Sequence, residues 1–178
     1  KKTPEQVQTI EDIPFLPISF FKTHQVITQM PLEPATVFPD TESVDKNTGS
    51  AFCFTSSGTS GSETSKHYVP DLSLYEASYM AAFEIFYGPV ENYCVLALLP
   101  AYLEREGSSL IYMAEDLIAK SGHPQSGFYL HNHEALHKTL LELESKNTPV
   151  FLIGVSFALL DFSEKYSMSL KNTIVMET

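Results

Sequence analysis

From residue 50 onward, the chain alternates short apolar runs with segments in which apolar side chains recur every three or four residues. The apolar runs predict strands, and they cover residues 51–55, 66–69, 94–100, 127–130, 150–153 and 173–176. The periodic segments predict amphipathic helices, and they cover residues 71–87, 110–118, 136–143 and 156–166. Strands that alternate with helices are typical of a parallel sheet, so we expect an α/β fold with a largely parallel sheet and helices on both faces.

Capping residues mark the ends of several predicted helices. Ser73 and Glu76 have the spacing of a capping box at the start of the first helix, and Gly88 with the proline after it ends that helix. Asn132 is placed to cap the third helix, which ends before Pro149. The sequence therefore predicts the bounds of these helices as well as their number.

The first 48 residues differ from the rest of the chain. Six of the eleven prolines lie in the first 40 residues, and no glycine precedes Gly49. This composition predicts extended, turn-rich chain. Because residues 13–21 are strongly apolar, we expect the segment 1–48 to pack on the α/β body, which would span residues 49–178.

Charge and hydropathy argue against a nucleic-acid partner and against a membrane span. The formal net charge is -11, so the phosphate backbone of a nucleic acid would be repelled over most of the surface. The longest apolar stretch, residues 150–160, is shorter than the ~20 residues that a bilayer requires, and no membrane span is expected. The polar residues after Lys1 and Lys2 lack the apolar core of a signal peptide, which favours a cytoplasmic location.

The two cysteines, Cys53 and Cys94, each lie inside an apolar strand-like run with no C-x-x-C partner. This placement favours buried reduced thiols over a disulfide or a zinc framework. A catalytic nucleophile at either position is the less favoured alternative.

The segment between the first two predicted strands is the most informative for function. It contains two glycines three residues apart and the hydroxyl groups of Ser56, Ser57, Thr59, Ser60, Ser62 and Thr64, and Lys66 follows it. Converging backbone N–H groups, hydroxyl donors and a lysine charge suit a triphosphate. The spacing does not match a Walker A loop, in which the lysine directly follows a glycine. A flexible hairpin tip without a ligand is the alternative interpretation.

The segment Ser56–Gly61 resembles the phosphate-binding signature of adenylate-forming enzymes, the acyl-CoA synthetase superfamily, which usually reads T-S-G-T-T-G-x-P-K. Two extra residues precede Lys66 here, and Ser65 replaces the usual proline. This longer loop is similar to that of the acyl-protein synthetase (LuxE-type) branch, which activates fatty acids for the aldehyde supply of bacterial luciferase. Residues 13–24 and 98–109 carry the same resemblance, which covers nearly the whole chain.

The resemblance implies that residues 49–178 form part of a nucleotide-binding adenylation domain, the N-terminal half of the large domain of such an enzyme. It implies ATP and Mg²⁺ as cofactors. The implied reaction is attack of a fatty or other carboxylic acid on the α-phosphate, giving acyl-AMP and pyrophosphate, followed by transfer to a thiol of an acceptor protein. The implied phosphate-binding residues are Ser56, Ser57, Gly58, Thr59, Ser60, Gly61, Ser62, Thr64 and Lys66.

The resemblance also places several functional groups after Thr178. These are a Tyr-Gly-x-Thr-Glu motif that serves nucleotide and magnesium, the domain with the catalytic lysine, and the cysteine that carries the acyl group. We therefore expect this chain to be inactive alone and assign no catalytic residue within it. A non-catalytic nucleotide-binding or acyl-binding module is the alternative function.

Two further stretches resemble pocket residues of the superfamily. Gly154, Val155 and Ser156 match a Gly-Val-Pro turn that borders the acyl and nucleotide pockets, with serine in place of proline. Tyr102 matches a position beside the bound acyl group, and an ordinary interface residue is an equally good interpretation of it. For Gly154 an equally good interpretation is a tight crossover in which glycine lets a helix pack closely on the sheet.

The string His133-Glu-Ala-Leu-His137 matches the H-E-x-x-H pattern of zinc hydrolases. A zinc hydrolase also needs a third ligand and a shaped cleft, whereas this match lies at an expected helix start after Asn132, where exposed polar residues are common. We therefore expect no metal site there and keep the zinc hydrolase as the least favoured function.

Overall fold

The computed structural model describes residues 3–13, 15–26, 52–56, 64–99, 107–130 and 132–178. The chain divides into two compact units, residues 1–70 and 71–178. The predicted boundary after residue 48 lies outside the described residues and stays a prediction.

The first unit contains short helices and one hairpin. The helices are two 3₁₀ turns, η1 (Pro4–Gln6) and η2 (Ile10–Asp12), and the single turn α1 (Phe20–Thr23). The strands β1 (Phe52–Thr55) and β2 (Lys66–Val69) pair antiparallel, as the two predicted strands around the loop require. The ring of Phe21, in α1, stacks on the ring of His67 with centroids 4.6 Å apart, so α1 contacts β2.

The second unit is an α/β fold with a four-stranded, all-parallel sheet, as the alternation of strands and helices predicts. The strands follow the order β4-β3-β5-β6. Their bounds are β3 (Cys94–Leu98), β4 (Gly127–Phe128), β5 (Val150–Gly154) and β6 (Thr173–Glu177). The helices are α2 (Leu72–Tyr87), η3 (Val90–Asn92), α3 (Ser109–Ser121), α4 (His133–Ser145) and α5 (Ser156–Lys165).

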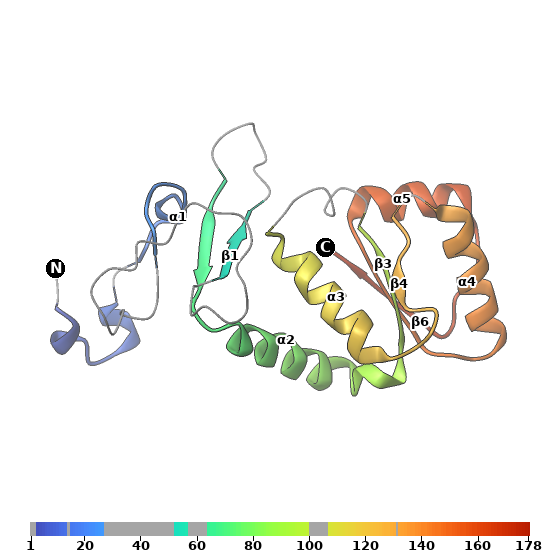
Figure 1. Cartoon of the computed structure of the whole chain (residues 1–178), viewed down its shortest axis with the longest axis horizontal. Helices are drawn as coiled ribbons and strands as arrows, with labels where there is room; N and C mark the ends of the chain where they lie inside the picture. Colours follow the sequence, from blue (N-terminus) through green and yellow to red (C-terminus); the bar gives the residue numbers. More distant parts are fainter. Residues whose placement is uncertain (1–2, 14, 27–51, 57–63, 100–106, 131) are drawn as a thin grey trace. The chain divides into compact units, whose positions relative to one another are not determined.

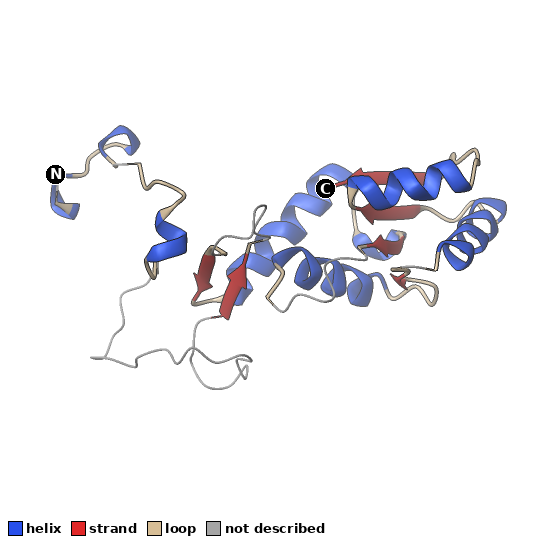
Figure 2. Ribbon diagram, turned by 90° about the horizontal axis from the view of Figure 1, so that it is seen from above, coloured by secondary structure: helices blue, strands red, loops and turns tan. Residues whose placement is uncertain are grey.

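Helices cover both faces of this sheet. Figure 1 shows the strands between α3 on one side and α4 and α5 on the other, and Figure 2 shows the same layers from above. Phe151 of β5 contacts Phe83 and Tyr87 of α2, which places α2 on the α3 face. The chain reaches β4 from β3 through α3, and it returns past β3 to β5 through α4. These two crossovers run in opposite directions across the sheet. Because such connections are right-handed, their helices α3 and α4 must lie on opposite faces of the sheet.

The core lies on both sides of the two central strands. Every residue of β3 and β5 is buried, because each of these strands has a neighbour on both edges and helices on both faces. The core is completed by side chains that each helix points toward the sheet. The most buried of these are Phe83, Ala114, Leu117, Leu136, Leu140, Leu143, Ala158 and Phe162.

The predicted capping box at the start of α2 is wrong. The carboxylate of Asp71 accepts the backbone N–H of Ser73 at 2.9 Å and is therefore the cap. Glu76 instead accepts a hydrogen bond from the hydroxyl of Tyr112 on α3. The cap at Asn132 is confirmed, since its side chain accepts the N–H of Ala135 at 3.0 Å.

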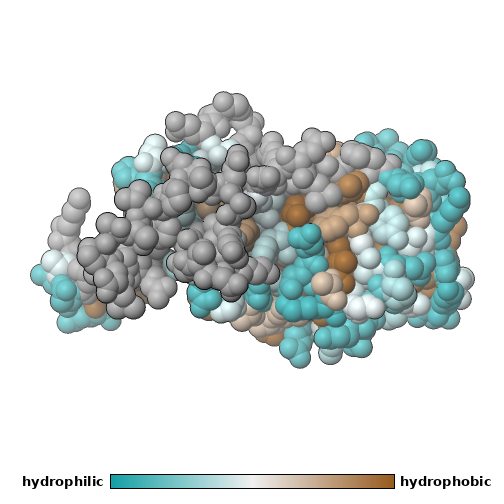
Figure 3. Space-filling model, in the orientation of Figure 1, coloured by the Kyte–Doolittle hydropathy of each residue, from teal (hydrophilic) through white to brown (hydrophobic). Residues whose placement is uncertain are grey.

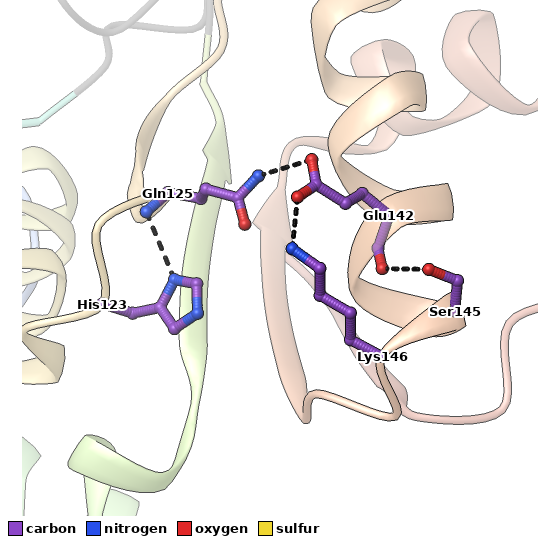
Figure 4. A network of polar contacts seen from close by, with 5 residues as sticks. All are labelled: His123, Gln125, Glu142, Ser145 and Lys146. Carbon is purple, nitrogen blue, oxygen red and sulfur yellow. Dashed lines mark hydrogen bonds and ion pairs between the residues drawn. The ribbon is translucent and has the colours of Figure 1, made fainter.

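Polar contacts join the loop before β4 to α4. Gln125 donates from its side-chain amide to the carboxylate of Glu142 at 3.1 Å, and Glu142 also pairs with Lys146 (Figure 4). The N–H of Gln125 donates to Nδ1 of His123 at 3.2 Å. These contacts hold the turn that leads into the short strand β4.

Candidate functional site

The hairpin β1–β2 forms the base of the Ser/Gly loop, which is the segment of residues 56–65 between the two strands. The register pairs Phe52 with Val69 and, at the loop end, Thr55 with Lys66. Beyond the strands, the N–H of Ser56 donates to the carbonyl oxygen of Ser65 at 3.0 Å, and the N–H of Ser65 donates to Oγ of Ser56 at 3.0 Å. These two bonds close the neck of the loop.

The structure gives Ser56 a structural role beside its predicted one. Its hydroxyl oxygen is an acceptor for Ser65, and its own proton can still be donated to a ligand. Ser65 is buried, while Thr64 and Lys66 are exposed at the neck. The predicted phosphate-binding residues 57–62 lie outside the described residues, so the structure brings together only Ser56, Thr64 and Lys66 of that set.

Burial raises the pKa of the Cys53 thiol, and the positive charge of Lys66 opposes this increase. The thiol therefore stays protonated at neutral pH, which does not favour a nucleophile. Burial also raises the pKa of Cys94, which is fully buried in β3. Both cysteines are free, as the sequence predicts.

In the second unit, the neighbouring strands β3 and β5 are followed by connections that run to opposite faces of the sheet. The chain leaves β3 toward α3 and leaves β5 toward α5, on the opposite face. In open α/β sheets, ligands bind in the crevice at the carboxyl ends of two such strands. Gly154, Val155 and Ser156 lie at this point, and Tyr102 lies outside the described residues.

Gly154 is required for packing. A Cβ atom at this position would lie 2.7 Å from Cγ of Leu159, which is too close for two carbon atoms. This close approach supports the tight-crossover interpretation of Gly154. Val155 is buried, and only Ser156 among the three residues is exposed. Its hydroxyl donates to the carboxylate of Glu177 at the end of β6.

The structure contains an apolar cavity that the sequence did not predict. Its volume is about 330 Å³, and it lies on the α2 and α3 face of the sheet, between those helices, β5 and β6. None of the predicted pocket residues lines it. The lining side chains are Tyr79, Ala82, Phe83, Phe86, Tyr87, Met113, Leu117, Phe151 and Met176.

Polar bonds beside this cavity tie α2 to α3. The hydroxyl of Tyr79 donates to the carboxylate of Asp116 at 2.6 Å, and that carboxylate also pairs with Lys120. Burial and the bond to Asp116 raise the pKa of Tyr79, and burial and the bond to Glu76 raise the pKa of Tyr112 to about 12. Both phenols therefore stay protonated and act as donors that fix the two helices side by side.

The histidines of the H-E-A-L-H string pack against α5. His133 lies edge-on to Phe162, with centroids 5.7 Å apart, and His137 stacks on Tyr166 at 4.5 Å. Glu134 is exposed and pairs with Lys138 at 2.7 Å. Among the described residues, no three metal-ligating side chains lie close enough together to hold an ion. The two rings thus contribute to helix packing.

Comparison with protein-family models, with curated proteins and with solved structures finds no match to this chain. In the part of the chain that the structure describes, no helix has the length and hydropathy needed to cross a membrane.

Proposed function

We propose that the chain supplies the triphosphate-binding part of an enzyme that activates a carboxylic acid, of the fatty-acid class, to an acyl-adenylate and passes the acyl group to a protein thiol. One observation carries the proposal: the closed neck of the β1–β2 hairpin sets Lys66 beside a loop rich in hydroxyl groups and glycine. The parallel sheet and its switch point also support it, because nucleotide-binding folds share them. The predicted cytoplasmic location belongs to this proposal.

In this proposal, Lys66 and the hydroxyls of Ser56 and Thr64 hold the β- and γ-phosphates of ATP. Mg²⁺ accompanies the nucleotide and neutralises phosphate charge. The contribution of the chain is to position the triphosphate and to stabilise the charge of the leaving pyrophosphate. The acid attacks the α-phosphate, and pyrophosphate leaves.

The test is the affinity of the chain for Mg-ATP, measured by isothermal titration calorimetry. Lys66→Ala removes a charge-assisted bond of about 1.5–3 kcal/mol, so the affinity should fall tenfold or more. Lys171→Ala is the matched control. Lys171 is exposed just before β6, at the amino end of the sheet, and its loss should leave the affinity unchanged. Equal affinities of wild type and Lys66→Ala would refute the proposal.

A binding module for an apolar ligand is the second candidate, favoured by the cavity between α2 and α3. Ala82 lines the cavity and Ala81 does not, although both are exposed on α2. A fluorescent fatty acid should bind to the wild type and be displaced by unlabelled fatty acids. Ala82→Trp should therefore abolish binding of the fluorescent fatty acid, and Ala81→Trp should not. Binding of fatty acids without binding of Mg-ATP would favour this module over the ligase.

A further inference from the structure

The outer edge of β6 has unused hydrogen-bonding groups. β6 pairs with β5, and among the described residues no strand pairs with its other side. The carbonyl of Asn172 accepts from Val150, and the N–H of Thr178 donates to Gly154, so even-numbered residues point their backbone groups toward β5. Because these groups alternate in direction along a strand, those of Thr173, Val175 and Glu177 point away from the sheet.

Apolar side chains lie on both faces of this edge. Met176 is 37% exposed and lines the cavity, as does Phe86, which is 77% exposed on α2. Val175 alternates with Met176 and so lies on the opposite face, and it is 51% exposed. Figure 3 shows apolar atoms, in brown, at the surface of the second unit.

The strand also lacks the features that usually protect an edge. Natural edge strands carry proline, lysine or a bulge that prevents pairing with another chain. β6 contains no proline or lysine, and Glu177 is its one charged residue. An edge of this kind is suited to pairing.

We infer that β6 pairs with β6 of a second copy of the chain, antiparallel about a two-fold axis through Val175. In this register Thr173 lies opposite Glu177, and Val175 lies opposite its own counterpart. These are the residues whose backbone groups point outward, so all of them find partners. Registers centred on neighbouring residues pair fewer of the five residues. The interface is isologous, as in most dimers.

Side chains are compatible with this register on both faces. Ile174 lies opposite Met176 of the second copy on the face of the cavity, so the second copy extends the apolar wall beside it. The two Val175 side chains meet on the other face. The two Glu177 carboxylates are four residues apart along the ladder, about 14 Å, which exceeds the screening length of ~8–10 Å in physiological salt.

The molar mass of the chain in solution, measured by light scattering after size-exclusion chromatography over a range of concentrations, tests this dimer. The wild type should approach twice the 19.9 kDa of one chain. Val175→Lys places two lysines opposite each other at the axis and should give the mass of one chain. Leu141→Lys, at a residue 47% exposed on α4, is the control and should leave the dimer intact. A wild type that stays monomeric up to its solubility limit would overturn the inference, as would a dimer that Val175→Lys leaves unchanged.

A cross-link tests the register and remains decisive if Val175→Lys fails to fold. Opposite residues of a hydrogen-bonded antiparallel pair have Cα atoms about 5.5 Å apart, within the range of a disulfide. Val175→Cys should form a covalent dimer under mild oxidation, and Leu141→Cys should not. Equal yields for the two variants would contradict the register. Both assays proceed without nucleotide or acid, so their outcome is independent of the proposed function.

Discussion

Two glycines of the sheet in the second unit differ in what surrounds them. Gly154 ends β5 where Leu159 of α5 packs on the strand, and a Cβ there would lie 2.7 Å from the leucine Cγ. Gly127 begins β4, and nothing lies within 4 Å of a Cβ built on it. Neither glycine has a positive φ, so steric contact alone decides the effect of an added methyl group.

We predict that Gly154→Ala lowers the free energy of unfolding by about 1–3 kcal/mol, the usual cost of overpacking. Gly127→Ala should instead be neutral or stabilise by about 0.4–1 kcal/mol, because alanine restricts the unfolded chain. Urea unfolding followed by circular dichroism measures both. Combining Gly154→Ala with Leu159→Ala should relieve the contact between the two residues, and no recovery in the double variant would argue against this cause.

At the scale of elements, helix bounds followed from the sequence within three residues. Apolar period and capping are local properties, so α3, α4 and α5 could be predicted from neighbouring residues alone. The capping box at Ser73 was wrong because Asp71, two residues earlier, competes for the same N–H. The predicted strand 127–130 stops at Phe128, and Leu130 adopts a positive φ of 33°.

The candidate site could be predicted from the sequence only where its residues lie close together along the chain. The hairpin around the Ser/Gly loop lies within one stretch of sequence, and both strands were predicted there. The residues that line the cavity come from α2, α3, β5 and β6. Because these elements are far apart in the sequence, no local pattern of residues predicts that they meet. Similarly, the bond between Tyr112 and Glu76 joins residues 36 positions apart, so Glu76 was interpreted from its nearest neighbours instead.

The carboxylate of Glu144 ties α4 to the start of β6. It accepts the backbone N–H groups of Lys171 at 3.1 Å and Asn172 at 2.9 Å, and the hydroxyl of Thr173 at 2.9 Å. Burial raises the pKa of Glu144, but these bonds together outweigh it and hold the pKa below its ordinary value of 4.5. The stabilising effect is therefore present above pH 4.5 and disappears as the pH falls through the lower pKa of the folded state.

We predict that Glu144→Gln lowers the free energy of unfolding by about 1 kcal/mol at neutral pH, the value for charged hydrogen bonds reduced by partial exposure to solvent. The difference from the wild type should shrink as the pH falls, because the wild-type carboxyl then becomes neutral as well. Urea unfolding over a pH series measures it. Glu164→Gln, at an exposed position of α5, is the control and should leave the free energy of unfolding nearly unchanged at neutral pH. A Glu144→Gln difference that persists in acid would show that charge is not its origin.

At the scale of the whole molecule, the apolar core belongs to the second unit. Every residue of the main core cluster lies between Phe83 and Phe162, and the side chains packed against it extend from Met80 to Ile174. None of the described residues of the first unit belongs to this cluster. The described buried residues of that unit are Phe54 and Ser65, both in the hairpin or its loop neck. Cooperative stability should therefore arise within residues 71–178.

We predict that residues 71–178, produced alone, unfold in one cooperative transition with a urea midpoint close to that of the corresponding transition in the full chain. The physical reason is that all described residues of this core belong to residues 71–178, and a domain with its own core can fold independently. Circular dichroism during urea unfolding of both proteins makes the comparison. A midpoint much lower than in the full chain, or a gradual loss of signal, would show that the first unit stabilises the sheet through contacts with it.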